Sequence, residues 1–379
     1  MTTRTLRSAI LVLSCVAPMG TLAGREAGTD FSKTLQASKG GTLQVSLNAG
    51  DIHITGWNRD EVQVTAAGLD PEDSDRPSVT QQGGTIRVTN DPSSDADIAI
   101  DIKVPLQFNI DLRTSDGTVD VDGPLSGNLK GSTSGGDIQL GALGGIVEMK
   151  TGGGNITAGD IKGDLTLETS GGDITASSIS GEGDLSTSGG EISVDDVGKA
   201  LHARTAGGNV TVGNVGGNAT VSTSGGDITM GSIVGSATLS TAGGNIDIRG
   251  GSGTVKASTA GGDLRLCNVT GVVEGSTAAG DILVNLKPGA NGRSHLQTSV
   301  GNIHVSVPAN AKATIKAKVR LQGWWQSAND DYDIRTDFTP TDYVKKKSSI
   351  SVTVNVNGGG ELIELETFMG GIDIRKATK

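Results

Sequence analysis

The amino-acid sequence predicts an all-β fold, a single-stranded parallel β-solenoid (β-helix) built from coils of 18 residues. Three observations predict it. A Thr-Gly-Gly turn recurs at a constant spacing, and hydrophobic residues alternate with polar ones between the turns. The 379-residue chain also has 59 glycines but only four Phe, three Trp and two Tyr, none of them within residues 114–303. That stretch must therefore fold around a narrow, repetitive core.

Threonine opens each repeat and is followed by a small residue and, in most copies, two glycines. Eight consecutive steps are 18 residues long, and degenerate copies begin at Thr114 and Thr298. The regular copies begin at Thr133, Thr151, Thr169, Thr187, Thr205, Thr223, Thr241, Thr259 and Thr277. Glycine reaches positive φ without strain, so we expect the Gly-Gly pair and a second glycine at position 13 to make two chain reversals per coil.

Aliphatic columns run through the repeats when the threonine is numbered position 1. Position 6 holds residues such as Ile138, Ile156 and Ile174, and positions 8, 11, 15 and 17 are also mostly apolar. Alternation at positions 6 and 8, and again at 15 and 17, predicts two strands per coil, each with one inward face. Coils stacked about 4.8 Å apart would join in parallel ladders and share one core.

Position 5 is acidic or an amide in every regular repeat. Asn between Asp residues reduces the repulsion between like charges at coil spacing and permits a hydrogen-bond ladder, so we interpret the column as a structural turn ladder. Its members are Asp137, Asn155, Asp173, Glu191, Asn209, Asp227, Asn245, Asp263 and Asp281. The alternative is a row of weak calcium sites. Calcium-binding solenoids need a Gly-Gly-x-Gly-x-Asp spacing, which this array lacks.

The two ends of the chain depart from the regular array of residues 113–307. Residues 24–112 keep the alternation less strictly and predict an N-terminal cap with irregular β coils. Residues 308–379 predict C-terminal coils and a cap that contains an aromatic-rich insertion. An open solenoid end must be covered, so we expect these aromatics to pack in the cap. The alternative is contact with a partner or glycan through Trp324, Trp325 and Tyr332.

Residues 1–23 have the order of a signal peptide: Arg4 and Arg7, an apolar run, then small residues ending at Ala23. A second possibility is that Cys15, in a loose lipoprotein box, is the lipidated first residue of the mature chain. Either reading predicts export to the periplasm, the cell surface or the medium. No later apolar run approaches the roughly 20 residues that span a bilayer, so we expect no transmembrane segment in the mature chain.

The formal charge is −11, and removing Arg4 and Arg7 makes it −13, which argues against a nucleic-acid partner. No metal or nucleophile motif surrounds the four histidines, so we expect no enzyme activity, metal or cofactor. His202 could meet Asp184 and a serine by stacking, a coincidence expected on this surface. A polysaccharide-acting β-helix enzyme stays an alternative, although such enzymes line a cleft with aromatics. Ice binding is a weaker one, because charges interrupt the threonine rows.

The repeat units themselves are distinctive, as in residues 169–174 and 223–228, which both read Thr-Ser-Gly-Gly-Asp-Ile, and in the closing Gly370-Gly371-Ile372. From Leu43 to Ile374 the chain resembles the bacterial putative-adhesin family of β-solenoid proteins of unknown function. The resemblance implies a right-handed helix, an adhesive role at the cell envelope and no catalytic residues. We therefore expect an exported adhesin that presents a repetitive surface to a cell-surface or envelope protein or polysaccharide. A periplasmic scaffold is the alternative.

Overall fold

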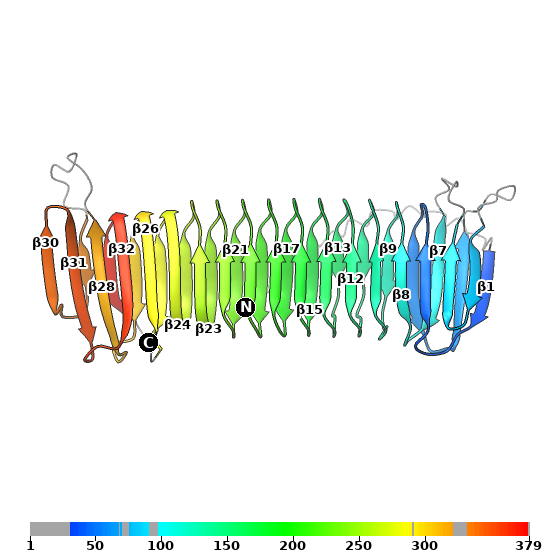
Figure 1. The fold of residues 1–379 in the computed structure, drawn as a ribbon, viewed down its shortest axis with the longest axis horizontal. Helices are drawn as coiled ribbons and strands as arrows, with labels where there is room; N and C mark the ends of the chain where they lie inside the picture. The colour runs from blue at the N-terminus through cyan, green and yellow to red at the C-terminus, as the bar shows by residue number, and fades with distance from the viewer. Residues whose placement is uncertain are drawn as a thin grey trace, which may run out of the picture.

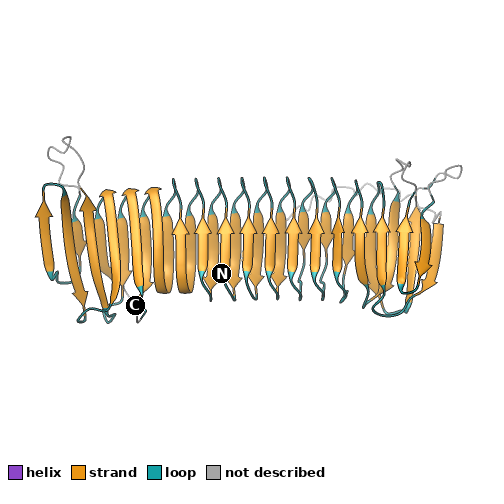
Figure 2. Ribbon diagram, in the orientation of Figure 1, coloured by secondary structure: helices purple, strands orange, loops and turns teal. Residues whose placement is uncertain are grey.

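The computed structural model describes residues 31–67, 69, 76–90, 98–289, 292–320 and 332–377. These residues form 33 β-strands and no helix, stacked side by side into a long rod (Figures 1 and 2). Consequently no helix in the described part of the chain could cross a membrane. Turns line both long edges of the rod, and most strand pairs are parallel (Figure 2). The predicted all-β solenoid is confirmed.

Each regular coil contributes one strand to each of two faces of the rod, which we call face A and face B. Face A contains β9 (Val119–Asp122), β11 (Ile138–Leu140), β13 (Ile156–Ala158), β15 (Ile174–Ile179), β17 (Ile192–Val197), β19 (Val210–Val215) and β21 (Ile228–Ile233). Face B contains β8 (Asn109–Arg113), β10 (Leu129–Ser132), β12 (Val147–Lys150), β14 (Leu165–Glu168), β16 (Gly183–Ser186), β18 (Leu201–Arg204), β20 (Ala219–Ser222) and β22 (Ala237–Ser240). Ile156 pairs with Ile174 and Leu165 with Gly183, so the 18-residue coil is confirmed.

Two longer strands, β23 (Ile246–Ser258) and β24 (Leu264–Ala279), run along both faces. β25 (Ile282–Lys287) continues face A, and β26 (Arg293–Val300) continues face B. The core between the faces is aliphatic. Ile138, Ile156 and Ile174 of position 6 are fully buried, and a third column joins Leu143 to Ile161 through single β-bridges at position 11.

The threonine that opens each coil is buried, which its polarity did not suggest. Thr169 is 3% exposed, and its Oγ1 donates to the carbonyl oxygen of Gly154 in the preceding coil at 2.9 Å. The Oγ1 of Thr169 also accepts the backbone N–H of Gly172 at 3.3 Å. The pattern repeats from Thr151 to Thr259. Each threonine thus stabilises its own turn and attaches it to the turn before, satisfying polar groups that would otherwise be buried unpaired.

The paired glycines of the array make reversals for a different reason from the one expected. None of them has a positive φ. Among the array glycines that the structure describes, positive values occur at position 13 in Gly253 and Gly271; the others are outside the regular repeats, as at Gly50, Gly117 and Gly301. A Cβ on Gly172 would lie 2.1 Å from the carbonyl oxygen of Gly154, closer than any side chain tolerates. The close approach of consecutive turns, rather than a left-handed backbone, therefore requires the second glycine of each pair.

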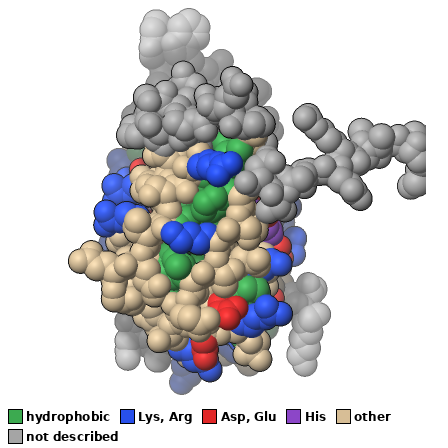
Figure 3. All heavy atoms as spheres, turned by 90° about the vertical axis from the view of Figure 1, so that its right-hand side faces the viewer, with side chains coloured by type: hydrophobic (Ala, Val, Ile, Leu, Met, Phe, Trp, Pro, Cys, Tyr) green, Lys and Arg blue, Asp and Glu red, His purple; other side chains and the backbone are tan. Residues whose placement is uncertain are grey.

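The N-terminal end is closed by strands whose spatial order differs from their order in the chain. β2 (Thr42–Ser46) lies between β6 (Thr85–Thr89) and β8, and β3 (Ile52–Trp57) lies between β7 (Ala99–Pro105) and β9. The antiparallel strands β1 (Phe31–Gln36), β4 (Glu61–Ala67) and β5 (Ser78–Gln82) complete this end. Lys and Arg side chains lie among hydrophobic side chains on its surface (Figure 3).

At the C-terminal end too, the spatial order of the strands differs from their order in the chain. β32 (Glu361–Met369) and β33 (Ile372–Lys376) pair with β26 and with β27 (Ile303–Val307). β28 (Ala313–Arg320) then pairs with the other edge of β32, so that β32, in red, lies between yellow and orange strands (Figure 1). β31 (Ser349–Val356), β30 (Asp342–Lys346) and β29 (Ile334–Thr336) complete the end.

Candidate functional site

The acidic and amide residues of position 5 lie along one turn edge of the rod. The side-chain oxygen of one such residue accepts the backbone N–H of the residue at the same position one coil later. Asp137 accepts from Asn155 at 2.7 Å, and Asp173 accepts from Glu191 at 2.8 Å. Glu191 differs, because its Oε1 accepts the side-chain amide of Asn209 at 3.0 Å. Within the described residues these acids form no three-ligand metal cluster.

The aromatic residues considered for partner contact are only partly placed. Trp324 and Trp325 lie outside the described residues, so contact through them stays a prediction. Tyr332 and Phe338 are half-buried, and both pack against the hydrophobic core. The Nζ of Lys376 lies 5.4 Å from the Phe338 ring centroid. Tyr332 and Phe338 therefore pack in the C-terminal end, whereas Tyr343 is exposed.

Charged side chains on face B form pairs between neighbouring coils. Lys130 bonds Glu148 at 3.0 Å. Two further pairs within the array join Lys150 to Glu168 at 2.8 Å and Lys256 to Glu274 at 3.0 Å. Arg293 and Arg320 bond Glu364 and Glu366 at the C-terminal end. Such pairs are exposed and add little stability, but they neutralise the cations that take part.

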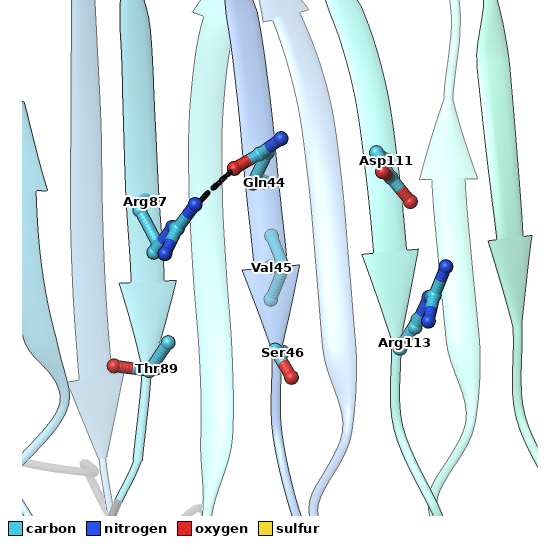
Figure 4. Close-up of a pocket in the computed structure, with 7 residues that line it drawn as sticks. All are labelled: Gln44, Val45, Ser46, Arg87, Thr89, Asp111 and Arg113. Atoms are coloured by element: carbon cyan, nitrogen blue, oxygen red, sulfur yellow. Dashed lines mark hydrogen bonds between the residues drawn. The ribbon is translucent and has the colours of Figure 1, made fainter. Parts of the chain in front are cut away.

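Two arginines at the N-terminal end of face B lack such an acid. They line a hollow of about 310 Å³ formed by Gln44, Val45, Ser46, Arg87, Thr89, Asp111 and Arg113 of β2, β6 and β8 (Figure 4). The Nη2 of Arg87 donates to the neutral Oε1 of Gln44 at 3.0 Å. Neither Arg87 nor Arg113 makes an ion pair with any residue that the structure describes. We call this surface the arginine hollow.

Neighbouring hollows enlarge this surface. One of about 390 Å³ shares Gln44 and Arg87, and one of about 630 Å³ shares Thr89 and Arg113. Elsewhere on face B, a hollow of about 470 Å³ contains the paired Lys256 and Glu274, and one of about 400 Å³ contains Lys and Arg side chains together with two glutamates. The arginine hollow differs from these two because it contains no ion pair, whereas they contain the Lys256–Glu274 and Arg293–Glu364 pairs.

A second cluster lies on face A, at the junction of β3 with β9. The Nδ1 of His53 is 3.2 Å from the Oδ2 of Asp120, and its Nε2 is 3.0 Å from the Oγ1 of Thr55. Asp122 is the third member: one ligand atom from each of His53, Asp120 and Asp122 lies within 4.8 Å of the others. All four side chains are half-buried or exposed, so the cluster is open to solvent.

A similar arrangement recurs at the C-terminal end of face A, with Ser306 at the place of Thr55 and a different residue at the place of Asp122. His304 on β27 lies opposite Asp373 on β33, and the Nδ1 of His304 is 3.2 Å from the Oδ2 of Asp373. Two residues further along β33, at the place that Asp122 has on β9, stands Arg375. Its guanidinium bonds Asp373 at 3.0 Å and Asp337 at 3.2 Å.

The other two histidines are on face B. His202 lies opposite Asp184 in the ladder. The Nδ1 of His295 is 3.9 Å from an oxygen of Glu364. The sequence suggested that His202 could meet a serine and Asp184. Among the described residues, the contacts that link a hydroxyl, a histidine and a carboxylate are instead those of Thr55, His53 and Asp120. The hollows described above do not include them, and a hydrolytic site would also need a cleft and oxyanion donors.

Sequence reasoning missed both sites, although one signal was present. Residues 50–52 and 117–119 are both degenerate copies of the repeat turn. If the two copies are aligned, His53 falls beside Asp120 and Thr55 beside Asp122, as in the observed register. No comparable signal marks the arginine hollow, because the pairing of β2 with β6 depends on the order of strands at this end.

The comparison with protein families decides the relationship. The family model Toastrack DUF4097 matches residues 147–338. The chain belongs to the Toastrack DUF4097 family. The resemblance to a family of unknown function is thereby confirmed. Both the arginine hollow and the His53 cluster lie before the matched residues of this Toastrack chain.

Two solved structures are similar to this Toastrack chain. One is a putative cell adhesion protein from Clostridium sporogenes, with 9% identity, coverage of 92% of this chain and 99% of the other, and a TM-score of 0.18. The other is a putative adhesin from Bacteroides fragilis, with 13% identity, coverage of 91% and 96%, and a TM-score of 0.25. No curated protein matches the sequence.

Proposed function

We propose that this Toastrack protein is an exported, non-enzymatic binding module of the adhesin type. Its partner would be an acidic polysaccharide of a cell envelope, bound at the arginine hollow. The observation that carries the proposal is that Arg87 and Arg113 share one hollow without a bonded acid, whereas Lys130, Lys150 and Lys256 of the same face each bond a glutamate. In a chain of formal charge −11, this local cationic site would select an anionic ligand.

The chemistry of the hollow suits a sugar acid. A guanidinium binds a carboxylate or phosphate with two parallel hydrogen bonds, a geometry that lysine does not offer. The hydroxyl of Ser46 lies between Thr89 and Arg113 in the ladder, and the Ser46 and Thr89 hydroxyls can bond sugar hydroxyls (Figure 4). Because the Arg87 guanidinium currently bonds a neutral amide, it would exchange that bond for a charged one without breaking an ion pair.

The acid content of the hollow supports binding rather than hydrolysis. Most glycosidases use two carboxylates on opposite sides of the scissile bond. Asp111 is the single acid among the residues that line the arginine hollow. The proposal therefore assigns no catalytic residue and needs no cofactor.

Export is supported by the order of residues 1–23, a charged start followed by an apolar run and small residues. It is tested by adding protease to intact cells, with lysed cells and the culture medium as comparisons, and by reading the mature N-terminus by mass spectrometry. Cleavage on intact cells or release into the medium supports the adhesin. Full protection until lysis would replace it with a periplasmic scaffold.

Ligand binding is tested with polygalacturonate, an acidic polysaccharide, against neutral dextran. We expect binding to polygalacturonate that weakens with added salt, and at least about tenfold weaker binding when Arg87→Gln and Arg113→Gln are combined. Lys130→Gln is the matched control, because it removes another exposed cation of face B that Glu148 already neutralises. Equal binding by the double variant, or equal binding to dextran, would refute the assignment of the arginine hollow.

A further inference from the structure

We propose that His53, Asp120 and Asp122 bind a divalent transition-metal ion of the zinc class. This site lies on face A, so it is separate from the arginine hollow on face B. The ion would connect β3, which is inserted between later strands, to β9, which begins the stack of array strands on face A.

The ligand atoms already converge. The Nδ1 of His53 and the Oδ2 of Asp120 are 3.2 Å apart, and the Asp122 carboxylate completes a set within 4.8 Å. Zinc binds nitrogen and carboxylate oxygen at about 2.0–2.2 Å, so an ion between the three groups requires only a small rotation of exposed side chains. Water can occupy the remaining position, because the cluster faces solvent.

The imidazole is oriented for this role by Thr55. When its Nε2 carries the proton, it donates to the Oγ1 of Thr55 at 3.0 Å, and the lone pair of Nδ1 then points toward Asp120. Metal-binding histidines commonly donate their second N–H to a neighbouring polar group, which holds both the tautomer and the ring orientation. Thr55 is thus a positioning residue and not a ligand.

The local charge also favours a cation. His53 lies between Asp101 of β7 and Asp120 of β9 in the ladder, so acids stand on both sides of it. Within the described residues, neither Asp120 nor Asp122 is bonded to a lysine or arginine. An imidazole ligand with carboxylates suits zinc and its neighbours better than calcium or magnesium, which prefer all-oxygen sites.

The C-terminal counterpart shows what the third residue decides. His304 and Asp373 reproduce the distance and the register of His53 and Asp120. Arg375 stands where Asp122 would be, and its guanidinium bonds Asp373. A cation is therefore already supplied there by the chain itself, and we assign no metal to that end.

The test is calorimetric titration of the untagged chain with ZnCl₂ after dialysis against EDTA. Cys267→Ser is present in every sample, because the thiol is partly exposed and is itself a zinc ligand. We expect one ion per chain and a higher melting temperature with zinc. His53→Ala and Asp122→Asn should each weaken binding at least about tenfold. His304→Ala is the matched control and should change nothing.

A gain of function sharpens the test. Arg375→Asp reproduces the N-terminal arrangement at the C-terminal end, so we expect a second zinc ion in a chain whose circular dichroism is unchanged. No saturable binding by the parent chain, or binding that survives His53→Ala, would overturn the proposal. Equally tight binding of calcium would also overturn it, since it would mean that the imidazole is not a ligand.

Discussion

The regular array and the two ends are built on different principles. Between β10 and β24, the spatial neighbour of a strand residue lies 18 residues away in the chain, as Ile192 and Val210 show. At the ends, β2 pairs with β6 and β8, and β32 pairs with β26 and β28. An internal coil therefore depends only on the coils beside it, whereas each end depends on segments brought together from distant parts of the chain.

The two regions also differ in chemistry. Repetition gives the array turns of one kind, each with a buried threonine, and several lysine–glutamate pairs between neighbouring coils, so one coil differs little from the next. The arginine hollow, the His53 cluster and its C-terminal counterpart all lie where the repeat is interrupted. The comparison suggests that the array supplies length and rigidity and the ends supply specific sites.

The largest expected effect comes from deleting a segment in each region. Removing residues 205–222 takes out one complete coil and places Ile228 on Ile192, so we expect a folded chain with slightly reduced stability. Removing residues 361–379 exposes the edges of β26 and β27 and the buried Leu296. We expect that chain to lose its cooperative melting transition and to aggregate.

Circular dichroism melting and size-exclusion chromatography of both deletions measure this difference. If the chain without residues 205–222 does not fold while the chain without residues 361–379 is a stable monomer, the proposed difference between the array and the ends is wrong.

A core substitution within the array is next in size. Ile174→Asp places an unpaired charge in a fully buried position, and we expect a loss of more than about 4 kcal/mol in the free energy of unfolding. Thr175→Asp changes the neighbouring, exposed residue and should alter stability by no more than about 0.5 kcal/mol. Denaturant titration of both variants provides the measurement, and equal stabilities would mean that the inward column is wrongly assigned.

The paired glycines give a smaller and more specific test. Gly172→Ala forces a Cβ to within 2.1 Å of the Gly154 carbonyl oxygen, and we expect it to cost about 1–3 kcal/mol through displacement of the turn. At Gly171 the nearest atom to an added Cβ is 3.4 Å away, which is ordinary contact, so Gly171→Ala is the matched control. Thermal melting of both should separate them. A larger loss at Gly171 would contradict the close-approach explanation.

Much of the array could be predicted from periodicity alone, because a fixed spacing determines which residues stack. The strands, the buried columns and the coil length follow from it. The roles of Thr169 and Gly172 do not, since both depend on how close one turn lies to the preceding turn. Periodicity locates such residues and leaves open why the turn requires them.

The ends could not be predicted in the same way. Nothing in the local pattern near Thr42 indicates that residues 85–89 lie against one edge of this strand and residues 109–113 against the other. Arg87 and Arg113 are brought to one surface only by that order of strands. Pairings between distant segments depend on the whole fold. The local signal for one of them was the pair of degenerate turn copies at residues 50–52 and 117–119, which align β3 with β9.

The smallest effect concerns Glu361 at the C-terminal end. Its side chain is 3% exposed, and its Oε1 accepts the hydroxyl of Ser294 at 3.0 Å. Burial raises the pKa of this carboxyl above its ordinary value, and the Ser294 bond offsets the shift only in part. Because the folded-state pKa is the higher one, the resulting stability is fully present below about pH 4.3 and is lost as pH rises through the raised value.

Glu361→Gln removes this titration while an amide oxygen can still accept the Ser294 hydroxyl. Relative to the parent chain, the variant should therefore gain stability between pH 4 and pH 7, by on the order of 1 kcal/mol or less. Melting temperatures of both chains across this range measure the difference. Thr314→Val, on the neighbouring strand β28, is a control without a titratable group and should show no such trend. A constant difference between Glu361→Gln and the parent would mean that the carboxyl does not titrate differently in the folded state.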